Sequence, residues 1–276
     1  MSNWHPDQLL QLECSMFYSN GAYSLFKVDT PIISGGSTPP YTNTKSILID
    51  GVDDFVTMGN VLQTSNIGAD PLTMSIWFKT TDSSTQILMA KWYNPSPYGG
   101  YSMHITGNNM LTFFIGSFQG SSYILVRKSI ASVSDGSWHH FAVTYDGSRN
   151  ANGVTLYYDG SIVINPSIIK NVAPNYINVN PVDFTIGARG TVSSNFFHFN
   201  GTLDEGSYFD SELSASDITT IWNSGVPNNL NDLSTPPTSW WRCGDGDTSP
   251  ILTDNGSDGN DGTMTNFNTF SNDVPT

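Results

Sequence analysis

The sequence is short of charged residues, and of glutamate in particular. Its 276 residues include only 24 acidic and 10 basic ones, so 12% are charged, against about 25% in a typical soluble protein. Glu13, Glu205 and Glu212 are the only glutamates. Helical bundles and coiled coils need many Glu, Lys, Ala and Leu residues, so this composition argues against both. A net charge of −14 with so few Lys and Arg also argues against a nucleic-acid partner.

Three further features are missing. No apolar run approaches the roughly 18 residues of a membrane-spanning helix, so we expect no membrane span. The first ten residues have neither a basic region nor a long apolar segment, so we expect no classical secretory signal. The two cysteines, Cys14 and Cys243, lie far apart in the sequence, which excludes a disulfide framework and a zinc site of usual spacing.

Turn-forming and aromatic residues are abundant instead, with 25 Gly, 15 Pro, 15 Phe, 12 Tyr and 7 Trp. From Thr44 onward, short apolar segments alternate with turn signals, and Asp159-Gly160 is typical of a tight type I′ hairpin turn. One helix is predicted after Ser214, whose hydroxyl forms a capping box with Asp217, and Gly225 marks its end. The pattern predicts an all-β antiparallel sandwich or barrel with one short helix.

The chain is expected to have three parts: an N-terminal arm and linker over 1–43, a sandwich over 44–230, and a C-terminal segment over 231–276. The last segment is too short to bury Trp240 and Trp241 by itself, so we expect it to fold back on the sandwich. The alternative is that it begins a truncated second copy of the domain.

The arm is apolar between Leu9 and Phe26, and Gly35-Gly36 and Pro39-Pro40 form a semi-flexible joint after it. Such a segment is too apolar for a free tail. It is expected either to attach the protein to a partner or a second copy of itself, or to cover an open face of the sandwich.

Four segments in order resemble laminin-G-like, concanavalin-A-like jelly rolls. Ser46–Val56 resembles their opening strand and Leu72–Lys79 the next long strand, while Asp135–Gly147 followed by Val154–Gly160 is the most characteristic stretch. The resemblance covers about 44–225. It implies a concanavalin-A-like (laminin-G-like) two-sheet antiparallel jelly-roll sandwich with one short helix.

The C-terminal segment resembles a piece that usually precedes the opening strand of this family. Trp240–Gly246 and Asp254–Met264 carry that likeness, and their residue pattern is similar to that of laminin-G-like proteins carried by marine phages. This implies a virion as the location of the protein.

An enzyme is disfavoured. The wider fold includes glycanases, which place two carboxylates about 5–9 Å apart across the glycosidic bond. The acidic strand available here holds Asp204 and Glu205, and adjacent strand residues are expected to point to opposite faces of a sheet. We therefore expect no catalytic residues.

Calcium is the expected cofactor, if there is one. Asp50, Asp53 and Asp54 supply three carboxylates beside a glycine, and calcium prefers oxygen ligands on loops. The resemblance adds Asp204 or Glu205 to this set. The alternative is that these aspartates form Asx turns and caps.

A loop with four aromatic residues is the candidate glycan site. Trp92, Tyr93, Tyr98 and Tyr101 lie within ten residues, and sugars stack their apolar faces on aromatic rings. The alternative is that Trp92 and Tyr101 cover the edge of the core, which leaves Tyr93 and Tyr98 exposed.

Together these features favour a non-enzymatic virion structural or adhesion protein: a phage head decoration, fibre or tail-associated protein. Its expected partners are capsid or tail proteins and host-surface glycans, and its arm is compatible with a homo-oligomer. The alternative is a secreted or cell-surface carbohydrate-binding module.

Overall fold

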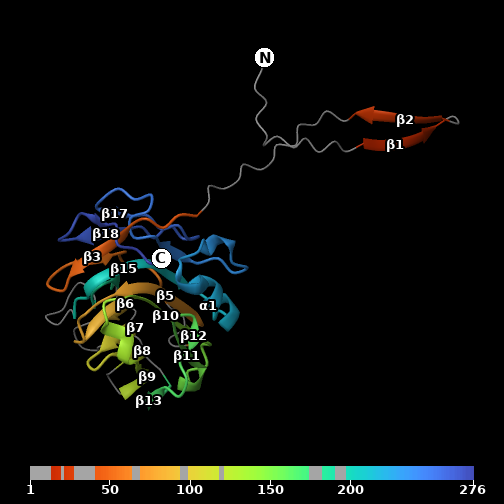
Figure 1. Cartoon of the computed structure of the whole chain (residues 1–276). Coiled ribbons are helices and arrows are strands. Elements are labelled where there is room, and N and C mark those ends of the chain that lie inside the picture. Colours follow the sequence, from red (N-terminus) through yellow and green to blue (C-terminus); the bar gives the residue numbers. More distant parts are fainter. Residues whose placement is uncertain are drawn as a thin grey trace. The chain divides into compact units, whose positions relative to one another are not determined.

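The structure, a computed structural model, describes these residues: 14–19, 22–27, 41–63, 69–93, 99–117, 121–173, 182–189 and 197–276. The chain divides into two units, Met1–Pro40 and Tyr41–Thr276. In the first, β1 (Cys14–Ser19) and β2 (Ala22–Lys27) form an antiparallel hairpin (Figure 1). The second unit begins three residues before the expected start of the sandwich.

The second unit is a sandwich of two antiparallel sheets, which confirms the predicted fold class (Figure 1). One sheet has eight strands in the order β12-β11-β10-β5-β15-β3-β19, with β16 paired to β15. The other has nine strands in the order β13-β9-β8-β7-β6-β14-β4-β18-β17.

The strands of the eight-stranded sheet are β3 (Ser46–Asp50), β5 (Leu72–Lys79), β10 (Trp138–Tyr145), β11 (Val154–Tyr158), β12 (Ser161–Ile162), β15 (Asn200–Phe209), β16 (Ser239–Trp241) and β19 (Phe270–Ser271). Those of the nine-stranded sheet are β4 (Phe55–Thr57), β6 (Gln86–Tyr93), β7 (Gly99–Thr106), β8 (Met110–Ser117), β9 (Ser122–Ser129), β13 (Ser167–Asn171), β14 (Phe184–Ile186), β17 (Ile251–Leu252) and β18 (Gly262–Thr265). The helical elements are α1 (Ala215–Trp222) and the 3₁₀ turns η2 (Ala131–Ser134), η3 (Ala151–Gly153), η4 (Asn223–Gly225) and η5 (Leu230–Asp232).

The two predicted local motifs are present. Asp159 and Gly160 both have positive φ, 46° and 70°, as a type I′ turn requires, and they join β11 to β12. At the start of α1, the Ser214 hydroxyl accepts from the Asp217 amide and the Asp217 carboxylate accepts from the Ser214 amide. This capping box satisfies two of the amides that a helix leaves open at its N-terminus.

Apolar side chains form three clusters. The main one lies between the sheets and includes the fully buried Phe78, Phe113 and Trp241. A second lies where α1 meets the eight-stranded sheet and includes Ile218 and Ile221. A third consists of residues of β6 and β8, with residues of β9 packed against it.

Residues 239–276 supply strands to both sheets. β16 pairs with β15 and β19 with β3 in the eight-stranded sheet, while β18 pairs with β4 in the nine-stranded sheet. The Trp241 ring stacks on Phe184 at 5.6 Å, and Cys243 is a buried free thiol. In the part of the chain that the structure describes, no helix has the length and apolarity to cross a membrane.

Candidate functional site

Asp204 and Glu205 lie together in the middle of β15, on a β-bulge. Asp204 pairs with Trp77 and Ser207 with Ser75, so the strand holds one residue more than its partner, and Glu205 takes the left-handed conformation with φ 50°. The expectation that these carboxylates point to opposite faces is wrong, because the bulge breaks the alternation of the strand. Both contact the segment that leads into β3.

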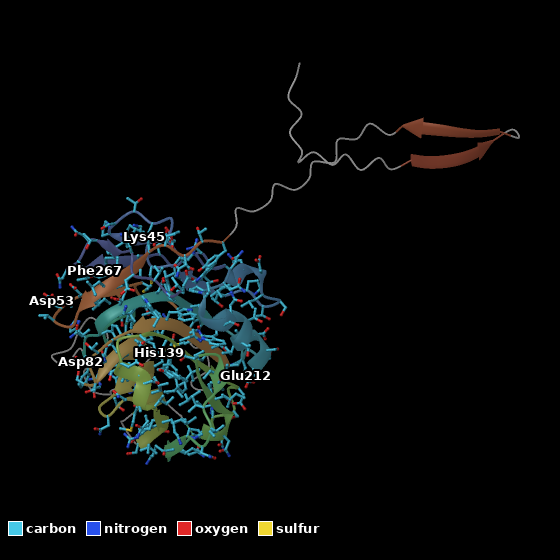
Figure 2. The ribbon with its side chains drawn as sticks, viewed as in Figure 1. Lys45, Asp53, Asp82, His139, Glu212 and Phe267 are labelled. Atoms are coloured by element: carbon cyan, nitrogen blue, oxygen red, sulfur yellow. The ribbon has the colours of Figure 1, made fainter. Side chains whose placement is uncertain are left out.

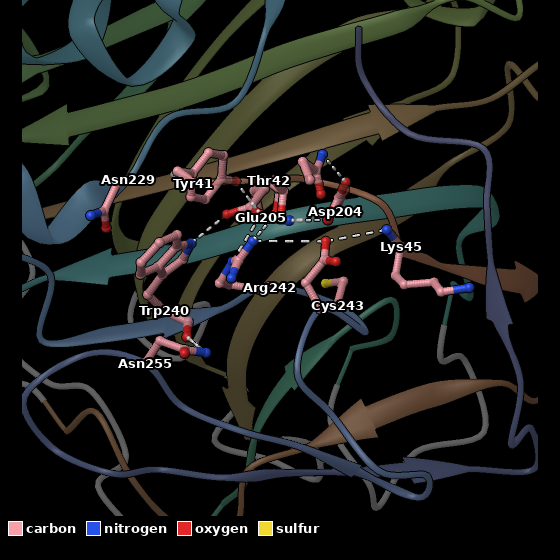
Figure 3. A network of polar contacts seen from close by, with 12 residues as sticks. Tyr41, Thr42, Lys45, Asp204, Glu205, Asn229, Trp240, Arg242, Cys243 and Asn255 are labelled. Carbon is pink, nitrogen blue, oxygen red and sulfur yellow. Dashed lines mark hydrogen bonds and ion pairs between the residues drawn. The ribbon is translucent and has the colours of Figure 1, made fainter. Parts of the chain in front are cut away.

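Glu205 is enclosed by donors from two distant parts of the chain (Figure 3). Its carboxylate accepts a hydrogen bond from the Tyr41 hydroxyl at 2.6 Å and one from the Trp240 indole N–H at 2.5 Å. Arg242 Nε lies 3.6 Å from the same carboxylate, and the guanidinium is 4.6 Å from the centre of the Tyr41 ring. The neighbouring Asp204 accepts from the Asn43 amide at 2.8 Å.

Burial and mutual repulsion make this carboxylate pair hold a proton. Burial raises the pKa of Asp204 well above 3.8, and the charge of Glu205 raises it further. Burial raises the pKa of Glu205 to about 7, against the lowering effects of Tyr41, Arg242 and Trp240. Both carboxylates accept two hydrogen bonds, but among the described residues only Glu205 has a cation within 4 Å, so Asp204 is the member that holds a proton more readily. The partners of both carboxylates are residues of the same chain, so this pair connects segments of the fold.

The loop after β3 brings Asp50, Asp53 and Asp54 together. One carboxylate oxygen from each lies within 4.8 Å of the others, and Figure 2 places Asp53 at the rim of the sandwich. The Asp54 carboxylate accepts from the Asp50 amide at 3.1 Å, and that of Asp50 accepts from the Val52 amide at 2.8 Å. Burial raises the pKa of Asp54, and the two neighbouring aspartates raise it further.

Asp204 and Glu205 do not belong to this cluster. In the pairing of β3 with β15, Asp50 lies opposite Asn200, and the register runs on to Leu203 opposite Ile47. Asp204 is thus four residues further along the strand, roughly 13 Å away at about 3.3 Å per residue. The structure therefore does not bring Asp204 or Glu205 into the expected calcium set. The three loop aspartates remain, and an oxygen-only set suits calcium, which these three side chains would hold.

The four aromatic residues of the candidate glycan loop do not share one surface. Tyr101 faces the core, is 1% exposed, and donates its hydroxyl to the Leu62 carbonyl at 2.5 Å, so it is not part of a binding site. Tyr98 and the side chain of Tyr93 lie outside the described residues. Trp92 is 5% exposed and belongs to the third apolar cluster.

Trp92 starts an aromatic strip on the outer face of the nine-stranded sheet, defined here as Trp92, Phe114 and Tyr123. The rings of Trp92 and Phe114 are 4.8 Å apart, and those of Phe114 and Tyr123 are 5.2 Å apart. Trp92, Gly100, Gly116 and Tyr123 form one row across β6 to β9. Because the two glycines in that row have no side chains, the Phe114 ring spans the space between Trp92 and Tyr123.

A cavity of about 140 Å³ lies on this face. Its lining combines the strip with hydroxyls, a histidine and two arginines: Thr85, Ile87, Trp92, Ser102, His104, Thr106, Thr112, Phe114, Leu125, Arg127, Arg189 and Phe197.

Two of these lining residues have unusual surroundings. The Arg189 guanidinium lies 5.1 Å from the centre of the Trp92 ring and 4.6 Å from that of Phe197, so it is held between two aromatic faces. Burial, followed by the charge of Arg189, lowers the pKa of His104 to about 3, which makes this imidazole neutral at neutral pH. The Ser102 hydroxyl lies 3.1 Å from His104 Nδ1.

Of the residues on this surface, the sequence pointed only to Trp92. A signal for the rest was present, because Phe113–Ile115 and Tyr123–Val126 carry apolar residues at consecutive positions. A strand that is apolar on both faces needs a second apolar surface besides the core. The contributions of Arg127, Arg189 and His104 depend on how the strands pair.

Comparisons with known proteins agree on the fold. A laminin-G-type family model described as "Concanavalin A-like lectin/glucanases superfamily" matches residues 50–219, more than half of the chain. A putative carbohydrate binding protein from Bacteroides ovatus is similar in structure, with a TM-score of 0.57 and 16% identity over 92% of this chain and 68% of the other. A search of curated proteins by sequence found no match.

Two further structures show weaker likeness. The CBM40 of the Ruminococcus gnavus IT-sialidase, bound to α2,3 sialyllactose, has a TM-score of 0.45 and 14% identity over 65% of this chain and 96% of the other. Mouse laminin α1 chain domains LG4-5 have a TM-score of 0.41 and 14% identity over 72% of this chain and 46% of the other.

The protonated Asp204 predicts a pH dependence of stability. Its pKa is raised in the folded state, so between about pH 4 and that raised value the folded chain keeps a proton that the unfolded chain releases. The unfolding free energy contributed by this group therefore falls as pH rises, by up to about 1.4 kcal/mol per pH unit. Asp204→Asn removes this titration, so the variant should gain stability relative to the wild type as the pH rises above 5 in urea unfolding.

Asp210→Asn is the matched control, since it makes the same substitution at an exposed position just after β15. Its stability difference from the wild type should stay constant over that range. A constant difference for Asp204→Asn as well would show that Asp204 is not protonated in the folded chain.

The loop aspartates predict stabilisation by calcium. A cation between Asp50, Asp53 and Asp54 offsets their repulsion. At a free calcium concentration of ten times Kd, binding adds about 1.4 kcal/mol to the unfolding free energy. Millimolar calcium should raise the melting temperature of EDTA-dialysed protein, and Asp53→Asn should abolish this shift. Asp82→Asn, which changes another Asx-turn aspartate, should retain it. Identical melting curves in EDTA and calcium would exclude the site.

Proposed function

Because the chain belongs to the concanavalin A-like lectin/glucanases superfamily, we propose that it is a non-enzymatic glycan-binding module. The binding surface is the outer face of the nine-stranded sheet. The observation that carries the proposal is the cavity on this face, with the Trp92 and Phe114 rings in its lining. Aromatic rings bind the apolar faces of sugars, and pockets of this kind combine them with a few placed polar groups.

The cavity is small, with room for one sugar residue at most. At about 140 Å³ it is well below the 300–1,000 Å³ of larger ligand pockets. The hydroxyls of Ser102, Thr106 and Thr112 can each donate and accept hydrogen bonds, as sugar hydroxyls require. The module would therefore bind one residue of a glycan, such as the terminal one.

The placement of the carboxylates supports a role without catalysis. Glycoside cleavage needs two carboxyl groups that flank the sugar bond. Asp204 and Glu205 belong to β15 of the eight-stranded sheet, whereas the cavity lies over β6 to β9 of the nine-stranded sheet. None of the described residues that line the cavity is acidic.

The N-terminal unit supplies attachment in this proposal. It is a unit of its own, and it contains a two-stranded hairpin, a structure that is marginally stable alone in water. Such a hairpin gains stability by pairing with a partner. We propose a capsid or tail protein of a virion as that partner, which makes the chain a decoration, fibre or tail-associated adhesion protein that presents its sandwich to host glycans.

Replacing the planar ring of Trp92 tests the glycan surface. Trp92→Leu keeps an apolar side chain but removes the ring that lines the cavity and holds Arg189, so binding of an oligosaccharide selected on a glycan array should weaken about tenfold, or ~1.4 kcal/mol, in calorimetry. Trp222→Leu, on α1, should bind as the wild type does. Unchanged binding by Trp92→Leu, with both variants folded by circular dichroism, would place the glycan elsewhere.

Deleting residues 1–40 tests attachment. The remaining unit, Tyr41–Thr276, has its own core and should keep its melting temperature and its glycan binding. It should fail to copurify with the particles that carry the full chain, because the pairing hairpin is gone. Undiminished copurification, or loss of solubility on deletion, would contradict this role of the arm.

A further inference from the structure

The lining of the cavity on the nine-stranded sheet carries positive charge, whereas the whole protein is negative. The chain has a net charge of −14 and four arginines, and two of them, Arg127 and Arg189, line the cavity. Building on the proposed function, we infer that this site takes a sugar residue that carries a carboxylate or sulfate group.

The way Arg189 is held prepares it for an anion. Its guanidinium is fixed between the faces of Trp92 and Phe197, so its planar orientation is set before a ligand arrives. The N–H groups of a guanidinium lie in its plane and match the two oxygens of a carboxylate, or two oxygens of a sulfate, in a bidentate contact. A fixed fork loses less entropy on binding than a mobile side chain does.

Arg127 comes to the same cavity from another element. It lies on β9 in a row that runs through Thr112 on β8 and His104 on β7, whereas Arg189 follows β14. Two like charges that line one partly enclosed space repel each other, and an anion bound between them offsets that repulsion. His104 adds no third charge at neutral pH, because its pKa is lowered to about 3. It can hydrogen-bond a sugar hydroxyl beside the anionic group.

The charged groups of the lining favour an anionic sugar over a neutral one. Among the described residues that line this cavity, none is Asp, Glu, Asn or Gln, and the two charged side chains are both arginines. A guanidinium only donates hydrogen bonds, and a carboxylate or sulfate is the sugar substituent that accepts them and also carries the opposite charge.

The test compares matched ligands on the full chain. A glucuronate-terminated disaccharide, a sulfated disaccharide and their neutral parent are titrated by calorimetry at low and high salt. At least one acidic ligand should bind tenfold or more tightly than the neutral parent. This advantage should shrink as salt screens the arginines. A preference for the glucuronate or for the sulfate identifies which anion the site takes.

Arg127→Gln and Arg189→Gln should each remove most of the acidic preference. Lys128→Gln is the control: it makes the same charge change one residue along β9, at a side chain whose Nζ donates to the Asn165 carbonyl. It should keep the preference. If Arg189→Gln does not fold, Arg127→Gln decides the result.

Two results would overturn the inference, and they differ. Equal affinity for acidic and neutral ligands, or an acidic preference that survives the arginine variants, contradicts the anionic sugar but leaves glycan binding in place. Absence of binding by all three ligands and across a broad glycan array contradicts the proposed function, and the inference fails with it.

Discussion

The buried Glu205 carboxylate, paired with Arg242, joins parts of the sandwich that lie far apart in the sequence. It connects the central strand β15 to the C-terminal segment, and the Tyr41 hydroxyl adds the chain that leads into β3. A buried carboxylate left without its partner costs about 3–5 kcal/mol, so these segments are held where they satisfy Glu205. Arg242 also donates to the Thr42 carbonyl and lies against the Trp240 ring. The C-terminal segment is thereby part of the domain.

The outer faces of the two sheets differ in what covers them. The C-terminal segment and α1 bury Trp240, Ile218 and Ile221 on the eight-stranded sheet, and the two sheets bury their inner faces against each other. The outer face over β6 to β9 keeps the aromatic strip and the cavity. The polar network and the proposed ligand surface therefore lie on different sheets.

Local patterns in the sequence predicted the fold but only part of the site. Strand alternation, the Asp159-Gly160 turn and the Ser214 cap are set by neighbouring residues, and these predictions are confirmed. The bulge at Glu205 depends on the partner strands, so alternation alone gave the wrong faces. Tyr101 shares its strand face with Met103 and Ile105 in the core, whereas Trp92 meets Phe114 only through the register of three strands. Sequence spacing does not carry that information.

The proposed glycan site lies on the outer face of the nine-stranded sheet, against the aromatic strip. A ¹⁵N NMR titration of the full chain with a glucuronate-terminated oligosaccharide tests it most directly, because indole and guanidinium N–H signals report the groups that the ligand touches. The account predicts that the Trp92 Nε1 and Arg189 Nε signals shift with one shared Kd while the Trp240 Nε1 signal, held by Glu205, does not. Shifts confined to the loop of Asp50, Asp53 and Asp54, with Trp92 and Arg189 unmoved, would contradict it.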